Sequence, residues 1–146
     1  MQGYWQQPQA TEQVLSIDGW LRTGDVAIMT TDGFFKIVDR KKDMILVSGF
    51  NVYPSEIENL LVAHPDIEEV AAIGVPDSRS GEAIKLFVVE RNPVLTKDKL
   101  MDYCQQKLTG YKQPKYITFL NELPKSNIGK VLRCVLRESH GQASSD

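Results

Sequence analysis

Apolar and polar residues alternate along the chain in two patterns, one with the period of a strand and one with the period of a helix. Near the start, Val26 to Thr30 and Phe34 to Val38 read as two strands joined by Asp32-Gly33. Glycine permits the positive φ that a tight hairpin turn needs. A single hairpin cannot bury a core, so we expect this segment to belong to a sheet whose other strands lie elsewhere.

The region after Asp43 begins with a short strand and a helix. Met44 to Val47 is apolar and reads as the strand. The helix follows Tyr53, because a proline suits the first turn and Ser55 and Glu58 have the spacing of a capping box. His64-Pro65 ends it, since the residue before a proline avoids helical angles.

The remainder of the chain continues the mixture of strands and helices. Its expected elements are strands at Val70 to Val75, Ile84 to Glu90 and Tyr116 to Leu120, a helix between Thr96 and Gly110, and a short helix after Gly129. The order after the charged residues is therefore β, α, β, β, α, β, α. This order predicts a small α+β domain with a mixed or antiparallel sheet and flanking helices, preceded by β-strands of another domain.

Composition and charge exclude several classes of protein. The 146 residues are 42% hydrophobic and carry a net charge of -2, with lysine and arginine spread along the chain, so nucleic-acid binding is not expected. Cys104 and Cys134 are isolated, which fits a reducing compartment, and with His64 and His140 they form no metal site. No apolar run approaches the ~20 residues of a membrane span, so we expect a cytoplasmic protein.

Three polar places are not explained by packing. Asp25 ends the segment GWLRTGD, where its carboxylate could accept hydrogen bonds from two sugar hydroxyls, although such aspartates usually stand in turns. Arg40 follows Asp39 in a run of five charged residues and could hold ribose or phosphate oxygens, or form a surface ion pair. Lys130 ends the loop LPKSNIGK, where the ordinary interpretation is a solvated lysine at a helix start.

Together these places match a known pattern. The 26 residues from Asp18 to Asp43, with DGWLRTGD, DGF and DRKKD in order, resemble the signature stretch of the fatty acyl-CoA synthetases in the adenylate-forming enzyme superfamily. The segments SGFNVYPSEIE, GYKQPK and PKSNIGK resemble later motifs of the same family, and Gly3-Tyr4-Trp5 an earlier one. The resemblance runs from Met1 to about Glu138 and is strongest to bacterial long-chain fatty acid-CoA ligases, AMP-forming enzymes.

The resemblance implies a role for five residues. Asp25 would bind the ribose hydroxyls of ATP and its adenylate, and Arg40 would contact the same sugar. Lys130 would be the catalytic lysine, which meets the acid's carboxylate and the α-phosphate oxygens during adenylation. Lys42 occupies the hinge position, and Gly49 would leave room for the pantetheine arm of CoA.

The resemblance also implies how the chain is organised. Residues 1–39 would be a β-strand remnant of the large adenylation domain, residues 40–43 the hinge, residues 44–138 the C-terminal lid and residues 139–146 a disordered tail. ATP and CoA are then substrates, together with a fatty acid. The phosphate loop, the acyl pocket and the residues that bind Mg²⁺ belong to the family's N-terminal domain, the partner of this piece. We therefore expect the isolated piece to be inactive, and its motifs do not specify the acyl chain length.

Two questions stay open at this stage. One is the class of function, because a free-standing module could reuse this fold to bind a nucleotide or a protein partner. Turnover of acid, ATP and CoA by the chain or by its parent enzyme would separate the two hypotheses. The other question is location, since a cytoplasmic ligase could also associate peripherally with the inner face of the membrane.

Overall fold

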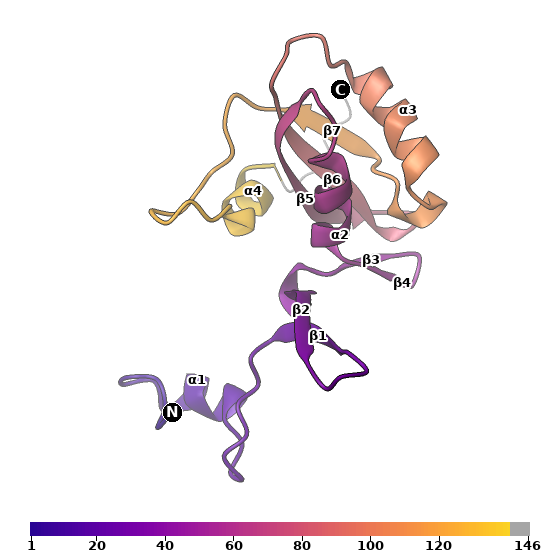
Figure 1. The fold of residues 1–146 in the computed structure, drawn as a ribbon. Coiled ribbons are helices and arrows are strands. Elements are labelled where there is room, and N and C mark those ends of the chain that lie inside the picture. Colours follow the sequence, from indigo (N-terminus) through magenta and orange to yellow (C-terminus); the bar gives the residue numbers. More distant parts are fainter. Residues whose placement is uncertain (141–146) are drawn as a thin grey trace. The chain divides into compact units, whose positions relative to one another are not determined.

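The computed structural model describes residues 1–140, and the chain divides into two compact units between Lys42 and Asp43. The first unit contains a helix and a hairpin, and the second contains the remaining strands and helices (Figure 1).

The first unit is a short helix followed by a two-stranded antiparallel hairpin. Helix α1 spans Pro8–Val14, and strands β1 (Asp25–Met29) and β2 (Phe35–Arg40) pair with each other. Gly33 has φ +83° in the connecting turn, so the predicted hairpin is confirmed. The sequence pattern did not predict α1, because none of its residues is buried and it therefore has no apolar face.

The first unit has almost no interior. Among residues 1–42, only Asp39 is buried. Large apolar side chains point to solvent instead, including Trp5, Trp20, Met29, Phe34, Phe35 and Ile37, each at least 66% exposed. Burial of apolar surface is the dominant stabilising term in folding, so this hairpin needs a cover that its own residues do not supply.

The second unit is a mixed sheet with flanking helices, as the sequence predicted, and the sheet has five strands where four were expected. Its elements are β3 (Ile45–Val47), β4 (Phe50–Val52), α2 (Pro54–Leu61), β5 (Ile67–Asp77), β6 (Gly81–Glu90), α3 (Lys97–Lys107), the 3₁₀ turn η2 (Gly110–Lys112), β7 (Tyr116–Phe119) and α4 (Arg133–His140). The sheet order is β4-β3-β6-β5, and β7 pairs with β6. Only the β6–β7 pair is parallel. The 3₁₀ turn η1 (Lys41–Asp43) precedes this sheet.

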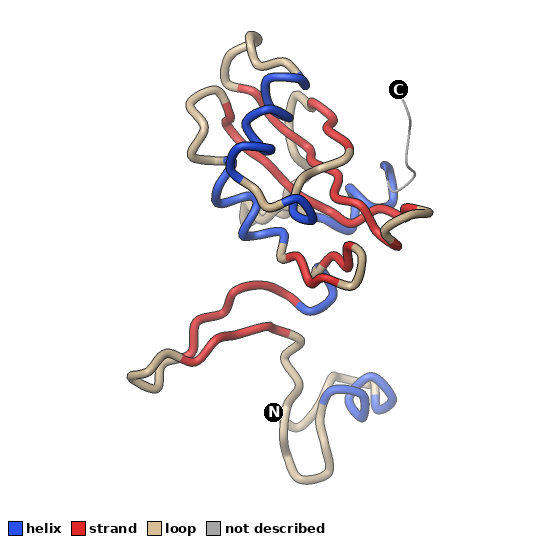
Figure 2. The backbone as a smooth tube through the Cα atoms, turned by 90° about the vertical axis from the view of Figure 1, so that its right-hand side faces the viewer, coloured by secondary structure: helices blue, strands red, loops and turns tan. Residues whose placement is uncertain are grey.

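Strand β6 separates two apolar clusters. Ile84, Leu86 and Val88 face the cluster that includes residues of α2 and α3, whereas Ala83, Phe87 and Val89 face the cluster that contains Leu136 of α4. Figures 1 and 2 show helices on both sides of the sheet. Because alternate side chains of a strand point to opposite faces, β6 is buried on both faces, and its residues from Ala83 to Val89 are apolar except for the buried Lys85.

Several boundaries differ from those that the sequence predicted. Strand β4 was not predicted, because its three residues lie in a motif that carries no alternating pattern. Strands β5 and β6 extend to Asp77 and Gly81, since their polar ends continue the hairpin ladder. Helix α4 begins at Arg133, three residues later than expected. The predicted tail, residues 139–146, begins within the last residues of α4, which ends at His140, and residues 141–146 lie outside the described part of the chain.

The predicted capping box at the start of α2 was wrong. The N-cap residue is Tyr53, which makes no side-chain cap hydrogen bond, and Ser55 already lies inside the first turn. The carboxylate of Glu58 is used elsewhere: its Oε1 accepts a hydrogen bond from the backbone N–H of Ala72 at 2.8 Å. Glu58 therefore connects α2 to β5.

Glu58 is also one member of a cluster of four charged side chains. The guanidinium of Arg133 donates to both carboxylate oxygens of Glu58, with Nη2–Oε2 at 2.6 Å and Nε–Oε1 at 3.3 Å. Asp43 lies beside it, accepting from Arg137 at 2.7 Å and forming an ion pair with Arg133 at 3.7 Å. A fork-to-fork pair of this kind fixes the orientation of both side chains. We call these four residues the Asp43–Arg137 cluster.

We predict that Glu58→Gln lowers the free energy of unfolding by about 3 kcal/mol, because it leaves the nearly buried guanidinium of Arg133 without its principal carboxylate. The control is Glu56→Gln, two residues earlier on the same helix. Glu56 pairs with Lys112 but its side chain is 51% exposed, so its loss should cost about 1 kcal/mol or less. Urea denaturation of both variants measures the difference, and equal losses would contradict the structural role of Glu58.

Candidate functional site

Asp25 and Arg40 lie opposite each other at the open end of the β1–β2 hairpin. They are cross-strand partners, and the Arg40 Nε lies 3.0 Å from the Asp25 Oδ1. Hydrogen bonds from backbone N–H groups hold the second strand in place beside the pair. The N–H of Arg40 donates to the carboxylate of Asp39, and the N–H of Lys41 donates to the carbonyl of Gly24. The predicted sugar-binding residues are thus adjacent, with oxygen acceptors and nitrogen donors side by side.

Lys42 stands next to this pair and ends the first unit. It lies in the 3₁₀ turn η1 with an exposed side chain. An open hollow of about 490 Å³ is lined by Thr23, Gly24, Arg40, Lys41 and Lys42. The predicted hinge residue therefore belongs to the same local surface as the predicted ribose contacts.

Gly49 forms the turn between β3 and β4. Ser48 has φ +50° and Gly49 has φ +84°, which is the conformation of a tight two-residue hairpin turn. A methyl group at Gly49 would meet no atom within 4 Å, so the space beside this glycine is open. Next along the chain, the ring of Phe50 stacks on that of Tyr111 with centroids 4.6 Å apart. The structure thereby brings together the SGFNVYPSEIE and GYKQPK segments, a pairing that no local pattern predicted.

Lys130 stands at the end of a closed turn. The N–H of Gly129 donates to the carbonyl of Ser126, and Ser126 and Lys130 share two further hydrogen bonds, one of them through the Ser126 hydroxyl. Gly129 has φ +79°, and Lys125 and Val131 form a bridge at the base of the turn. The side chain of Lys130 is exposed, and among residues 1–140 its ammonium group takes part in no ion pair. A fixed backbone thus carries a cation that is free to meet an anion.

The five predicted site residues are divided between the two units. Asp25, Arg40 and Lys42 belong to the first unit, while Gly49 and Lys130 belong to the second. Within the second unit, the loop before α4 and the turn between β3 and β4 lie on opposite sides (Figure 1). The second unit therefore presents two separate surfaces.

Asp77 and Cys104 are among the groups outside the predicted site whose pKa values are shifted. The ammonium of Lys115 and the N–H groups of Ser80 and Arg79 hold the pKa of Asp77 well below its usual range, which fixes the β5–β6 turn. Burial raises the pKa of the Cys104 thiol to about 11, so this cysteine is a core residue. Cys134 is exposed on α4, and both thiols are free.

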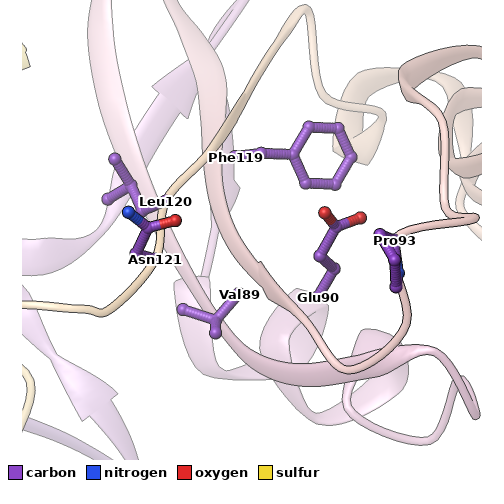
Figure 3. Close-up of a pocket in the computed structure, with 6 residues that line it drawn as sticks. All are labelled: Val89, Glu90, Pro93, Phe119, Leu120 and Asn121. Atoms are coloured by element: carbon purple, nitrogen blue, oxygen red, sulfur yellow. The ribbon is translucent and has the colours of Figure 1, made fainter.

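A further hollow of about 310 Å³ lies where β6 and β7 end. Figure 3 shows the residues that line it: Val89, Glu90, Pro93, Phe119, Leu120 and Asn121. None of the predicted site residues is among them. Within residues 1–140, no group of three or more histidine, cysteine, aspartate or glutamate side chains is placed to hold a metal ion. No helix of the described residues is long and apolar enough to cross a membrane.

Comparison with known proteins gives the family. The profile of the AMP-binding enzyme C-terminal domain matches residues 56–130, about half of the chain. The chain belongs to this family. It is 61% identical over 138 residues to a long-chain-fatty-acid-CoA ligase of Salmonella typhimurium, which covers 94% of this chain and 24% of that ligase. A feruloyl-CoA synthase of Amycolatopsis is 45% identical over 142 residues, or 97% of this chain and 29% of the synthase.

The fold agrees with solved structures of related enzymes. The crystal structure of ATP-bound MatB from Rhodopseudomonas palustris superposes with a TM-score of 0.89 at 35% identity, covering 95% of this chain and 28% of MatB. The chain thus spans about a quarter of the length of these curated relatives. The resemblance to acyl-CoA ligases and the α+β class are confirmed. The roles of Asp25, Arg40, Lys42, Gly49 and Lys130 remain predictions.

The sequence did not reveal the Asp43–Arg137 cluster. Asp43 ends a charged run, and Arg133 and Arg137 are four residues apart, which suggests only that the two arginines share one side of a helix. Nothing in the local pattern pairs residue 43 with residues more than eighty positions later. The pairing of these two partly buried arginines with Asp43 became visible only in the folded structure, where the two ends of the unit lie together.

We predict that Gly49→Ala lowers the free energy of unfolding by about 1 kcal/mol, because alanine is strained at φ +84° even though its methyl group meets no neighbour. The matched control is Gly110→Ala. Gly110 also has open space for a methyl group but its φ is not positive, so this substitution should leave stability unchanged or slightly raised. Thermal unfolding compares the two, and a harmless Gly49→Ala would show that the turn does not depend on glycine.

Proposed function

We propose that this chain is the C-terminal part of an ATP-dependent, AMP-forming fatty acid-CoA ligase. The intact enzyme would convert a fatty acid, ATP and CoA into acyl-CoA, AMP and pyrophosphate. The observation that carries this proposal is the 61% identity to a long-chain-fatty-acid-CoA ligase over 94% of the chain, including the Asp25, Gly49 and Lys130 segments. The isolated chain would be inactive, because the residues that bind the acid and the triphosphate would lie in the rest of the enzyme.

Asp25 and Arg40 would hold the ribose of ATP and of the acyl-adenylate. An ionised carboxylate can accept hydrogen bonds from both vicinal hydroxyl groups of a ribose, and a guanidinium can donate to the sugar oxygens. The 3.0 Å pairing of these side chains supports this role, because it holds acceptor and donor together before the nucleotide arrives. The 50% exposure of the Arg40 side chain leaves its other nitrogens accessible.

Lys130 would act in the first step, in which the carboxylate of the acid attacks the α-phosphorus of ATP in line and pyrophosphate leaves. Negative charge builds on the equatorial oxygens of that phosphorus, and an ammonium group fixed beforehand stabilises it without reorganisation. The closed turn from Ser126 to Lys130 supports this role, since it holds the lysine backbone while the side chain stays exposed.

Gly49 would act in the second step, in which the thiol of CoA attacks the acyl-adenylate and AMP leaves. The open space beside this glycine suits the passage of the pantetheine arm. Because the Lys130 loop and the Gly49 turn lie on opposite sides of the second unit, one orientation of that unit could not serve both steps. Rotation about Lys42, at the division of the chain, would present each surface in turn.

Mg²⁺ would be bound outside this chain. Within the described residues there is no cluster of carboxylate, histidine or cysteine side chains that fits a metal ion. The ion would accompany the triphosphate on the N-terminal domain, where it would offset phosphate charge. The contribution of this chain would be limited to the ribose contacts, the lysine and the CoA passage.

We predict that Lys130→Ala in the full-length parent enzyme slows adenylation by about a hundredfold to a thousandfold, as for the loss of one preorganised transition-state donor. Thioester formation from supplied acyl-adenylate should fall much less, because Lys130 would then be turned away. Pyrophosphate release and acyl-CoA formation measure the two steps. Lys107→Ala, an exposed lysine on α3, is the control and should change neither step. Equal losses in both steps would rule out the two-orientation hypothesis.

We also predict that Lys42→Pro separates the two steps in the opposite sense. Proline fixes φ near -65° and restricts the residue before it, so the backbone could no longer rotate freely here. Adenylation should stay within about tenfold of normal, whereas acyl-CoA formation should drop by about a hundredfold or more. Lys42→Ala removes the charge but keeps the backbone free, and should impair both steps only mildly. The hinge assignment fails if the proline and alanine variants behave alike.

A further inference from the structure

The Asp43–Arg137 cluster connects two places that the proposed mechanism treats separately. Asp43 is the first residue of the second unit and directly follows Lys42. Arg133 and Arg137 lie on α4, which begins three residues after Lys130. The contacts between Asp43 and the two arginines therefore join the end of the hinge to the helix that follows the Lys130 loop.

We propose that Asp43, Arg133 and Arg137 are positioning residues that make the Lys130 loop move as one body with the backbone after Lys42. This inference rests on the proposed function, in which Lys42 is the hinge and Lys130 meets the α-phosphate. It assigns no contact with substrate to the three residues. Their effect would be on the place of the lysine in each orientation.

The geometry of the cluster suits such a role. The side chain of Asp43 is 9% exposed and that of Arg133 is 18% exposed, so both are held largely away from water. Arg133 donates to both oxygens of Glu58, and Glu58 in turn accepts from the backbone of Ala72 in β5. The cluster is thus attached to the sheet and to α2. If Asp43 moves, the arginines must move with it, because no solvated side chain can simply rotate to restore the contacts.

The loop itself is tied at both ends. Before the turn, Lys125 forms an ion pair with Glu69 of β5. After the turn, the N–H of Leu132 donates to the carbonyl of Pro124, and Arg133 pairs with Glu58. The turn between these ties is closed by its own hydrogen bonds. Lys130 therefore has little freedom relative to the sheet as long as both anchors hold.

Stability alone is a weak explanation for this arrangement. Two apolar clusters already hold the second unit together, and buried ion pairs commonly add little compared with apolar residues of the same volume. What an ion-pair cluster does supply is a defined direction, because guanidinium and carboxylate groups pair in fixed planes. If the second unit rotates about Lys42, a fixed geometry of this cluster would return Lys130 to the same position after each rotation.

The first arm of the test uses this chain alone and does not depend on activity. Asp43→Asn keeps the size of the side chain and removes its charge, and the ion pairs that it breaks are to Arg133 and Arg137 on α4, outside the loop. We expect amide exchange of Gly129, Lys130 and Leu136 to rise at least fivefold, while the β5–β6 amides stay unchanged. Unchanged exchange in the loop would overturn the proposal.

Two further variants make this arm specific. Asp77→Asn breaks a different ion pair of the same unit, the one with Lys115, so its effect should stay within the β5–β6 turn at Arg79 and Ser80. Loop exchange that rises equally in Asp77→Asn would also overturn the proposal, because it would show general loosening. Arg137→Lys keeps a cation and should raise loop exchange less than Arg137→Met. If Asp43→Asn does not fold, Arg137→Met takes its place, because it breaks the same ion pair from the other side.

The second arm uses the full-length parent enzyme and compares the two half-reactions. Arg137→Met should slow adenylation about tenfold and thioester formation from supplied acyl-adenylate less than threefold, with Arg137→Lys restoring most of the difference. Equal slowing of both steps would mean a purely structural role and would overturn the proposal. If the parent shows no ligase activity, or Lys130→Ala leaves adenylation unchanged, the proposed function fails, and the exchange arm still decides whether the loop depends on Asp43.

Discussion

The guanidinium of Arg133 is largely shielded from water and must have its charge and its donors satisfied, and the arrangement of the second unit depends on that requirement. Arg133 meets it with Glu58 and Asp43, residues from a helix in the middle of the chain and from the start of the unit. The desolvation of such a group is expensive, so its partners cannot drift apart without a large penalty. The consequence is that α4, which follows the lysine loop and buries little beyond Leu136, is fixed by charge as much as by apolar contact.

The central hairpin of β5 and β6 must be covered on both faces, which is the second requirement on the second unit. Both strands carry apolar side chains on both faces, so each face needs a cover. Helices α2 and α3 cover one face, while Leu123, Val131 and Leu136 belong to the cluster on the other. The segment that contains Lys130 is therefore bounded by core residues on either side, and only its tip is free to reach outward.

The strands and helices that the sequence predicted correctly are those with a strong local pattern. The β6 run, the α3 helix with its Thr96 cap, and the DG turn each depend on neighbours in sequence. The motif match similarly located the segments that hold Asp25, Gly49 and Lys130, because it compares local strings. Neither approach could find α1, which has no apolar face, or the true partner of Glu58, which is set by a residue 75 positions away. Long-range polar pairing has no periodic signal, so it became visible only in the fold.

The exposed hairpin of the first unit matters for how this chain behaves in solution. β1 and β2 form a two-stranded sheet, so each has an outer edge with unpaired backbone groups, and Phe34, Phe35 and Ile37 stand uncovered beside them. Free strand edges beside apolar side chains are templates on which further chains can add. At high concentration the weak point of the molecule is therefore self-association through this hairpin. Colloidal solubility at this hairpin would then limit how the well-packed second unit can be stored and handled.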